Sequence, residues 1–138
     1  MSETENKKLK NFHFILQGKG GVGKTTVASF IAQYLKDRLQ EEYLAIDTDQ
    51  VNASFASFKA LNVESLNIME NNQILPRGWD TLIEKIINSD KSNIIVDNGA
   101  SSFVPLIAYA IENDMVDLLT SEDNSYTGNI FIHVVIAG

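Results

Sequence analysis

The sequence predicts an α/β fold in which helices flank a mainly parallel β-sheet. Short, solidly apolar runs alternate with segments whose apolar residues recur every three or four positions, and this alternation indicates βαβ units. The runs lack the polar alternation of a half-exposed strand, as is typical of a sheet covered on both faces. With 138 residues and 44% apolar composition, the chain is expected to form one domain with its own core.

The first half of the chain begins with a predicted buried strand at Phe12–Leu16. A glycine-rich loop follows, and a helix is expected from Lys24 onward. The apolar positions that would form its buried face are Val27, Phe30, Ile31, Tyr34, Leu35 and Leu39. A second strand is expected at Tyr43–Ile46 and a weak third strand at Leu66–Met69.

The second half continues the alternation. A helix is predicted from the spacing of Trp79, Leu82, Ile83, Ile86 and Ile87, with Asp80 as its expected cap. After a strand at Ile94–Val96, a helix is expected to open near Ser102, with Pro105 in its first turn. A short helix is expected at Met115–Leu119 and a last strand at Ile130–Ile136. No helix follows that strand, so the sequence is expected to be a domain cut short at its C-terminus.

Composition excludes several classes of protein. The chain has no cysteine, which rules out disulfides, thiolate zinc sites and iron–sulfur ligation. Its net charge of -7 argues against broad nucleic-acid binding. The longest apolar stretch, Phe103–Ile111, is too short to span a bilayer. Residues 1–11 are polar, lack the apolar segment of a signal peptide and are expected to be a disordered lead, so we expect a cytoplasmic protein.

The loop after the first strand carries the most specific motif. Gly18-x-x-x-x-Gly23-Lys24-Thr25 matches the P-loop pattern, in which backbone N–H groups and a helix N-terminus cradle the phosphates of a nucleotide. Lys24 would supply charge to the β and γ phosphates, and Thr25 would supply a hydroxyl to Mg²⁺. The predicted nucleotide-binding residues are Gly18, Lys19, Gly20, Gly21, Val22, Gly23, Lys24, Thr25 and Thr26.

Lys19 is a second lysine within the same loop. Two lysines serving one phosphate would repel each other, so Lys19 is more useful if it reaches a phosphate bound by a partner subunit. The alternative is a solvated loop lysine without a function.

The segment Lys19–Thr26 resembles the deviant Walker A motif of the ParA/MinD ATPase superfamily. The resemblance continues through Ile46–Phe55 and Val96–Phe103, covers nearly the whole chain, and within the superfamily is to the TraL proteins of plasmid conjugation. It implies an incomplete SIMIBI-type P-loop NTPase domain over residues 12–138, from which the C-terminal part of the family's domain is missing. It also implies ATP and Mg²⁺ as cofactors, a nucleotide-dependent homodimer in which Lys19 crosses to the partner, and other conjugation proteins as partners.

Three aspartates follow predicted strands, at the edge where open α/β sheets bind ligands. By resemblance, Asp49 matches the superfamily's water-positioning residue, and Asp47 is its less certain partner. Asp97 is placed as a Walker B acid that accepts hydrogen bonds from metal-bound water. The expected catalytic residues are therefore Lys19, Lys24 and Asp49, and the expected metal site comprises Thr25, Asp47 and Asp97. The alternative is that these acids are ordinary turn residues.

The leading hypothesis is a Mg²⁺-dependent ATPase that dimerises around nucleotide and acts as a switch in conjugative transfer. A small-molecule kinase or synthetase, a GTP-binding switch and a non-hydrolysing remnant remain open alternatives. Asn98–Ser102 departs from the family pattern after Asp97, which leaves the response of this loop to the γ-phosphate open. His13 and His133 are expected to be packed within strands rather than catalytic. Nothing in the sequence points directly to nucleic acid or membrane as a partner.

Overall fold

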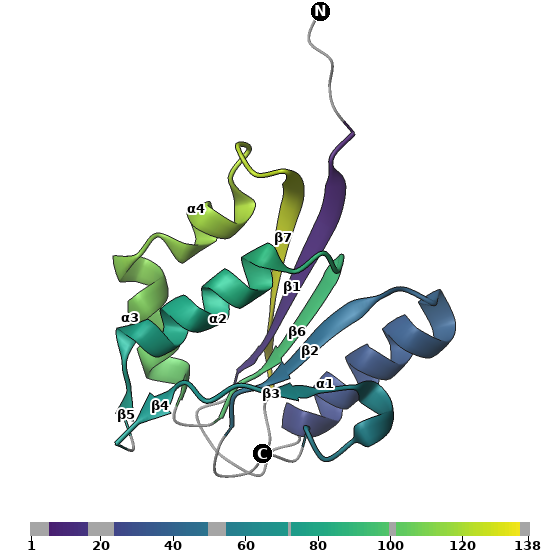
Figure 1. Ribbon diagram of the computed structural model, residues 1–138, viewed down its shortest axis with the longest axis horizontal. Helices are drawn as coiled ribbons and strands as arrows, with labels where there is room; N and C mark the ends of the chain where they lie inside the picture. Colours follow the sequence, from purple (N-terminus) through teal and green to yellow (C-terminus); the bar gives the residue numbers. More distant parts are fainter. Residues whose placement is uncertain (1–5, 17–23, 50–54, 72, 100–101, 136–138) are drawn as a thin grey trace, which may run out of the picture.

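The computed structural model describes residues 6–16, 24–49, 55–71, 73–99 and 102–135, without the side chains of Lys24, Thr25 and Phe103. It confirms the predicted α/β fold with a parallel sheet. Five strands pair in parallel in the order β3-β2-β6-β1-β7 (Figure 1). The strands are β1 (Lys8–Leu16), β2 (Tyr43–Asp47), β3 (Glu64–Ser65), β6 (Asn93–Asp97) and β7 (Tyr126–Val134).

Helices cover both faces of this sheet (Figure 1). The helices are α1 (Lys24–Gln33), which continues into the π-helix η1 (Tyr34–Leu39), α2 (Pro76–Asn88), α3 (Phe103–Glu112) and α4 (Met115–Thr120). A 3-10 turn η2 (Lys59–Leu61) and a small antiparallel hairpin of β4 (Met69–Glu70) and β5 (Gln73–Ile74) complete the described elements. No helix in the described part of the chain has the length and apolar character needed to cross a membrane.

The pleat of the central strands divides the core into two layers. Phe14 and Leu16 of β1 point toward α2, α3 and α4, whereas Ile15 points toward α1. Ile95 of β6 and Ala45 of β2 share the α1 side with Ile15. The strands are solidly apolar because each consecutive side chain meets a helix on one face or the other.

β1 begins at Lys8, four residues before the strand we expected, so residues 8–11 of the expected disordered lead are paired in the sheet. Lys10 shows why. Its side chain is buried, and its Nζ donates to the carbonyl oxygens of Ile87 at 2.9 Å and Ser89 at 2.7 Å, at the C-terminal end of α2. The ammonium also lies 4.8 Å from the ring centroid of Tyr126. A cation at the negative end of a helix stabilises both elements.

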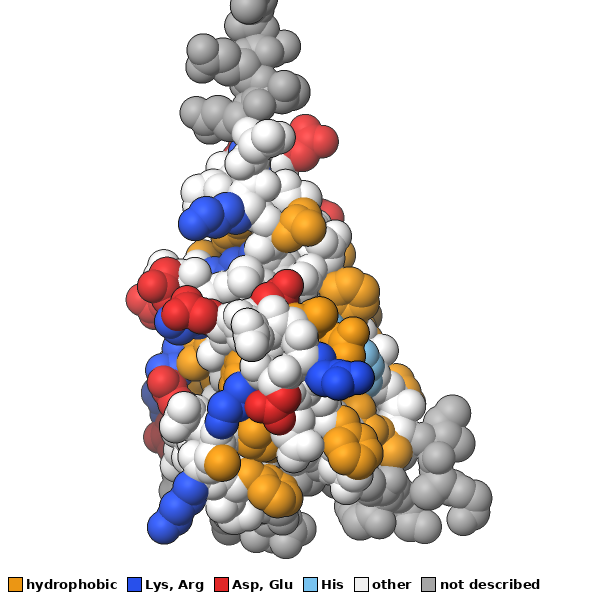
Figure 2. Space-filling view, turned by 90° about the vertical axis from the view of Figure 1, so that its right-hand side faces the viewer, with side chains coloured by type: hydrophobic (Ala, Val, Ile, Leu, Met, Phe, Trp, Pro, Cys, Tyr) orange, Lys and Arg blue, Asp and Glu red, His pale blue; other side chains and the backbone are white. Residues whose placement is uncertain are grey.

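The buried face of the helix after the glycine loop was predicted wrongly in part. Phe30 is 65% exposed, Tyr34 is 55% exposed and Leu39 is 46% exposed. The small residues Ala28 and Ala32 are buried instead, because they let α1 approach the sheet closely. Figure 2, which looks at the side of the molecule where α1 lies, shows hydrophobic side chains gathered on the surface.

Two smaller expectations were also wrong. The weak third strand lies at Glu64–Ser65, not at Leu66–Met69, because the side chain of Asn67 accepts the N–H of Met69 and turns the chain there. Asp80 does not cap α2, which begins at Pro76. Asp80 accepts a hydrogen bond from the hydroxyl of Tyr109 on α3. Burial raises the pKa of Tyr109 to about 12, and the hydrogen bond to Asp80 is the second cause of this rise.

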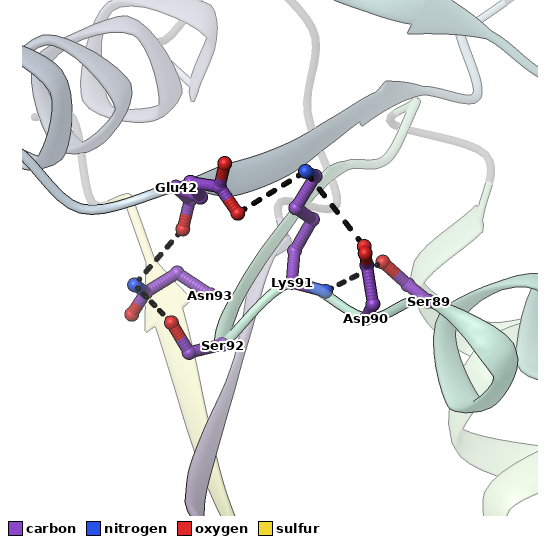
Figure 3. Close-up of polar contacts among 6 residues, drawn as sticks. All are labelled: Glu42, Ser89, Asp90, Lys91, Ser92 and Asn93. Carbon is purple, nitrogen blue, oxygen red and sulfur yellow. Dashed lines mark hydrogen bonds and ion pairs between the residues drawn. The ribbon is translucent and has the colours of Figure 1, made fainter.

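The turn from α2 into β6 is fixed by polar contacts at the amino end of the sheet (Figure 3). Lys91 forms ion pairs with Glu42 at 3.2 Å and with Asp90 at 3.7 Å. The amide of Asn93 donates to the backbone carbonyl of Glu42 at 3.2 Å. These contacts tie the start of β6 to the start of β2, so the opposite ends of the two strands are held in register.

His13 and His133 contact each other on the outer half of the sheet, as packed strand residues. The Nδ1 of His13 lies 2.9 Å from the Nε2 of His133, and the ring of His13 stacks on Phe131 at 4.9 Å between centroids. One imidazole must therefore donate and the other accept, which requires at least one neutral ring. Burial is the main cause that lowers the pKa of His13 to about 4, and the charge of His133 is the second cause.

This pair should make stability depend on pH in a defined window. The folded-state pKa of His13 is about 4 against 6.5 for the free side chain, so between these values the unfolded chain binds more protons. The free energy of unfolding should thus be highest above about pH 6.5 and fall as the pH drops toward 4, by about 2 kcal/mol after allowance for solvent screening of a half-buried ring. Urea denaturation of wild type and His13→Phe at several pH values measures the difference; parallel pH profiles would exclude His13 as its source.

Candidate nucleotide site

Of the predicted site residues that the structure describes, the three aspartates lie at the carboxyl ends of β2 and β6. The chain leaves β1 for α1 on one face of the sheet and leaves β6 for α3 on the other face. β1 and β6 are neighbours, so the crevice beyond their ends is the topological switch point where open α/β sheets bind ligands. Residues 17–23, which hold Gly18–Gly23 of the predicted P-loop, lie outside the described residues.

α1 begins at Lys24, so the predicted loop leads directly into a helix N-terminus. The backbone of Lys24 and Thr25 belongs to the first turn of that helix, and Thr26 is exposed in the same turn. Such a turn presents unpaired N–H groups and the positive end of the helix dipole, and both attract phosphate.

Asp47 and Asp97 are neighbours across the sheet. They are paired in register as the last residues of β2 and β6, and each is 1% exposed. Side chains two residues apart on a strand point to the same face, so both follow Ala45 and Ile95 on the side of α1. Two buried carboxylates therefore lie side by side on the face of the sheet that α1 covers.

Asp47 also holds the segment that follows β2. Its Oδ1 accepts the backbone N–H of Asp49 at 2.9 Å, and its Oδ2 accepts the N–H of Ala56 at 3.0 Å. Hydrogen bonds from backbone N–H groups favour the ionised carboxylate. Sequence reasoning did not predict that Asp47 anchors this loop.

Asp49 lies against the turn that follows β6. A β-carbon added at Gly99 would sit 3.2 Å from the Cγ of Asp49 and 3.3 and 3.4 Å from its carboxylate oxygens. Gly99 is buried, so this closeness leaves little space for a side chain. The structure thus brings Asp49 to the same edge as Asp47 and Asp97, beside the loop that leaves β6.

Sequence reasoning missed two buried polar residues at this edge, Thr48 and Asn98. Thr48 is 2% exposed and Asn98 is fully buried. The hydroxyl of Thr48 lies 3.2 Å from the Oδ1 of Asn98, and the backbone N–H of Thr48 donates to the carbonyl oxygen of Asp97 at 3.0 Å. A polar residue directly after a solidly apolar strand was the available signal, because it marks the point where the strand reaches the ligand edge.

The donor set fits a magnesium ion better than a soft metal. Carboxylate oxygens and a threonine hydroxyl are hard ligands, and Mg²⁺ is commonly held by one or two carboxylates together with substrate phosphates. Within the described residues no group of three or more His, Asp or Glu side chains gathers as a metal cage. The pair Asp47 and Asp97 would therefore act together with Thr25, whose side chain lies outside the described set.

Comparison with known proteins agrees with this geometry. The profile of the CobQ/CobB/MinD/ParA nucleotide binding domain matches residues 13–127. Protein TraL of Escherichia coli is 48% identical over 130 residues, which make up 94% of this chain and 52% of that protein. A second Escherichia coli protein named TraL is 45% identical over the same shares. The chain therefore spans about half the length of the curated relatives it matches.

Proposed function

Since this chain belongs to the CobQ/CobB/MinD/ParA nucleotide-binding family, we propose that it is a Mg²⁺-dependent ATP-binding and ATP-hydrolysing switch that dimerises around nucleotide. The similarity to TraL supports a role in plasmid conjugative transfer, with other conjugation proteins as partners and the cytoplasm as its compartment. The whole protein's activity and partners are part of this proposal, because the relatives are about twice as long.

One observation carries the proposal, namely the adjacent buried carboxylates of Asp47 and Asp97 on the face of the sheet that α1 covers. Two buried negative charges in register repel each other unless positive charge compensates them. The helix N-terminus would supply part of that compensation. A magnesium ion bound with the triphosphate would add to it and would neutralise charge on the phosphates.

Each residue then has a distinct role. Lys24 and the first turn of α1 would bind the β and γ phosphates, and Thr25 with Asp97 and Asp47 would hold the metal and its water. Asp49 would orient the attacking water, since it lies at the same edge, its N–H donates to Asp47 and its carboxylate lies beside Gly99. No residue here needs to form a covalent bond, because phosphoryl transfer is accelerated mainly by positioning and charge.

Phosphate release measured against protein concentration tests the hydrolysis and the switch together. We expect release from ATP that needs Mg²⁺ and whose rate per subunit rises with protein concentration, as a dimer requires. Equal rates with GTP would favour the GTP-binding alternative, and phosphate transferred to an acceptor would favour a kinase. Tight binding of ATP without any release would instead identify a non-hydrolysing nucleotide-binding protein.

Lys19→Ala should separate binding from dimerisation. A charge that acts on the partner's nucleotide contributes only when two loaded subunits meet, as an arginine finger does. The variant should bind Mg-ATP as the wild type does, fail to dimerise with ATP, and hydrolyse ATP at a rate per subunit that no longer rises with concentration. Light scattering with a slowly hydrolysed ATP analogue measures the dimer.

Lys59→Ala is the matched control, because Lys59 is an exposed lysine in η2 and is not part of the predicted P-loop. It should dimerise as the wild type does. Equal nucleotide-dependent dimerisation of wild type and Lys19→Ala would leave Lys19 as an ordinary loop lysine.

A further inference from the structure

The side-chain amide of Asn98 joins the ends of three strands. Its Nδ2 donates to the carbonyl oxygens of Ile15 on β1 and Val96 on β6, both at 3.4 Å. Its Oδ1 accepts from the hydroxyl of Thr48, which follows β2, at 3.2 Å. A buried amide must have its donors and acceptor satisfied, and here all the partners belong to the strands that lead into the site.

Thr48 adds a second tie between β2 and β6. Its N–H donates to the carbonyl oxygen of Asp97 at 3.0 Å, and its hydroxyl lies 3.2 Å from that same oxygen. The hydroxyl has one proton to share between Asp97 and Asn98. Thr48 therefore contacts both Asp97, the last residue of β6, and Asn98, the residue that follows it.

The neighbours of these two residues in the sequence are the ones that meet in the site. Asp49 directly follows Thr48, Gly99 directly follows Asn98, and a β-carbon at Gly99 would lie 3.2 Å from the Cγ of Asp49. The contact between Thr48 and Asn98 thus links the segment that carries Asp49 to the turn that carries Gly99.

We propose that Thr48 and Asn98 are positioning residues for ATP hydrolysis, forming a polar latch that holds Asp49 against the loop after Asp97. The latch rests on the proposed function, because its effect on rate presupposes that Asp49 orients water. Its hydrogen bonds, at 3.2 and 3.4 Å, are longer than the usual range, so each one is weak. A small displacement of a reacting group can nevertheless reduce the rate strongly.

Thr48→Val tests the latch, because it removes the hydroxyl and keeps the shape of the side chain. Thr48→Ser is the conservative variant, because it keeps the hydroxyl and removes only the methyl group. We expect Thr48→Val to bind Mg-ATP within about twofold of the wild type and to hydrolyse it about ten- to a hundredfold more slowly. Thr48→Ser should recover most of the rate. Asn98→Ala removes a buried amide from three strand ends and is expected to impair folding, so it does not carry the test.

Thr81→Val is the matched control, because the hydroxyl of Thr81 also donates to a backbone carbonyl, that of Arg77, but in α2. It should leave binding and rate unchanged. An unchanged kcat in Thr48→Val would overturn the latch, and so would an equal loss of kcat in Thr48→Val and Thr48→Ser. A loss of kcat that disappears after correction for the folded fraction, measured by thermal unfolding, would also overturn it.

The amide NMR spectrum without nucleotide separates this proposal from the proposed function. In Thr48→Val the signal of Gly99, on the other segment, should shift or broaden, whereas in Thr48→Ser it should stay near its wild-type position. An unperturbed Gly99 signal in Thr48→Val would overturn the latch even in an active enzyme. If the signals are perturbed in Thr48→Val but the wild-type protein does not hydrolyse ATP, the structural latch is supported, whereas its catalytic effect and the proposed hydrolysis are contradicted.

Discussion

Asp49→Ala should reduce ATP hydrolysis by about a hundredfold or more and leave the affinity for Mg-ATP within about threefold of the wild type. A carboxylate that orients the attacking water acts mainly in the transition state, so its loss affects kcat far more than binding. Asp49 is suited to this role because its N–H is held by Asp47 and its carboxylate lies beside Gly99. Single-turnover hydrolysis and a separate nucleotide titration measure the two quantities.

Asp117→Ala is the matched control for the loss of one acid, because Asp117 is an exposed residue of α4. It should leave both quantities unchanged. Normal hydrolysis by Asp49→Ala would show that Asp49 is not the water-orienting residue, and Asp47 would be tested next. Asp47 variants carry a second effect, since the carboxylate also accepts the N–H groups of Asp49 and Ala56.

Lys24→Ala should weaken triphosphate binding by about a hundredfold or more, the largest effect on affinity that we expect from one substitution. Lys24 is the first residue of α1, where the helix N-terminus and the predicted P-loop meet. Its ammonium is the charge expected to meet the β and γ phosphates, and charge-assisted contacts of this kind are among the strongest in proteins. Calorimetric titration with an ATP analogue measures the change.

Lys59→Ala again serves as the control, since it removes the same charge from an exposed position in η2. It should change the affinity by less than about twofold, because exposed charges are screened by salt. Wild-type affinity in Lys24→Ala would remove Lys24 from the site and place the P-loop interpretation in doubt.

The parts of the fold that could be predicted best from the sequence are the strands that are buried on both faces of the sheet. The strands that begin at Tyr43 and Asn93 appear where solid apolar runs occur, because parallel strands between two helix layers have no polar face. The same reasoning placed Asp47 and Asp97 at one edge, and the structure brings them into register. Their roles in metal binding stay predictions.

What sequence could not predict depends on distant partners. Helical spacing predicted a buried apolar face on α1 that includes Phe30 and Tyr34. In the structure these two side chains are exposed, and the small side chains of Ala28 and Ala32 pack against the sheet instead. The strand that includes Lys10 looked like a polar lead, because its partners at the end of α2 are 77 and 79 residues away in the sequence. Pairing over such separations leaves no local pattern in the chain.

Thr48 and Asn98 escaped prediction for a related reason. Each is a common turn residue by type, and only the meeting of β1, β2 and β6 turns the two into a connected group. The histidines are the converse case. His13 and His133 were expected to be packed in strands, and they contact each other across β1 and β7.

Calorimetric titration of the wild-type chain with ATP, ADP and GTP, with and without Mg²⁺, tests the central claim most directly. We predict saturable binding of one ATP per chain that is tighter with Mg²⁺, because the ion relieves the repulsion between the phosphates and the carboxylates of Asp47 and Asp97. Circular dichroism in the same buffer verifies that the chain is folded. A folded chain that binds none of these nucleotides in the presence of Mg²⁺ would contradict the account.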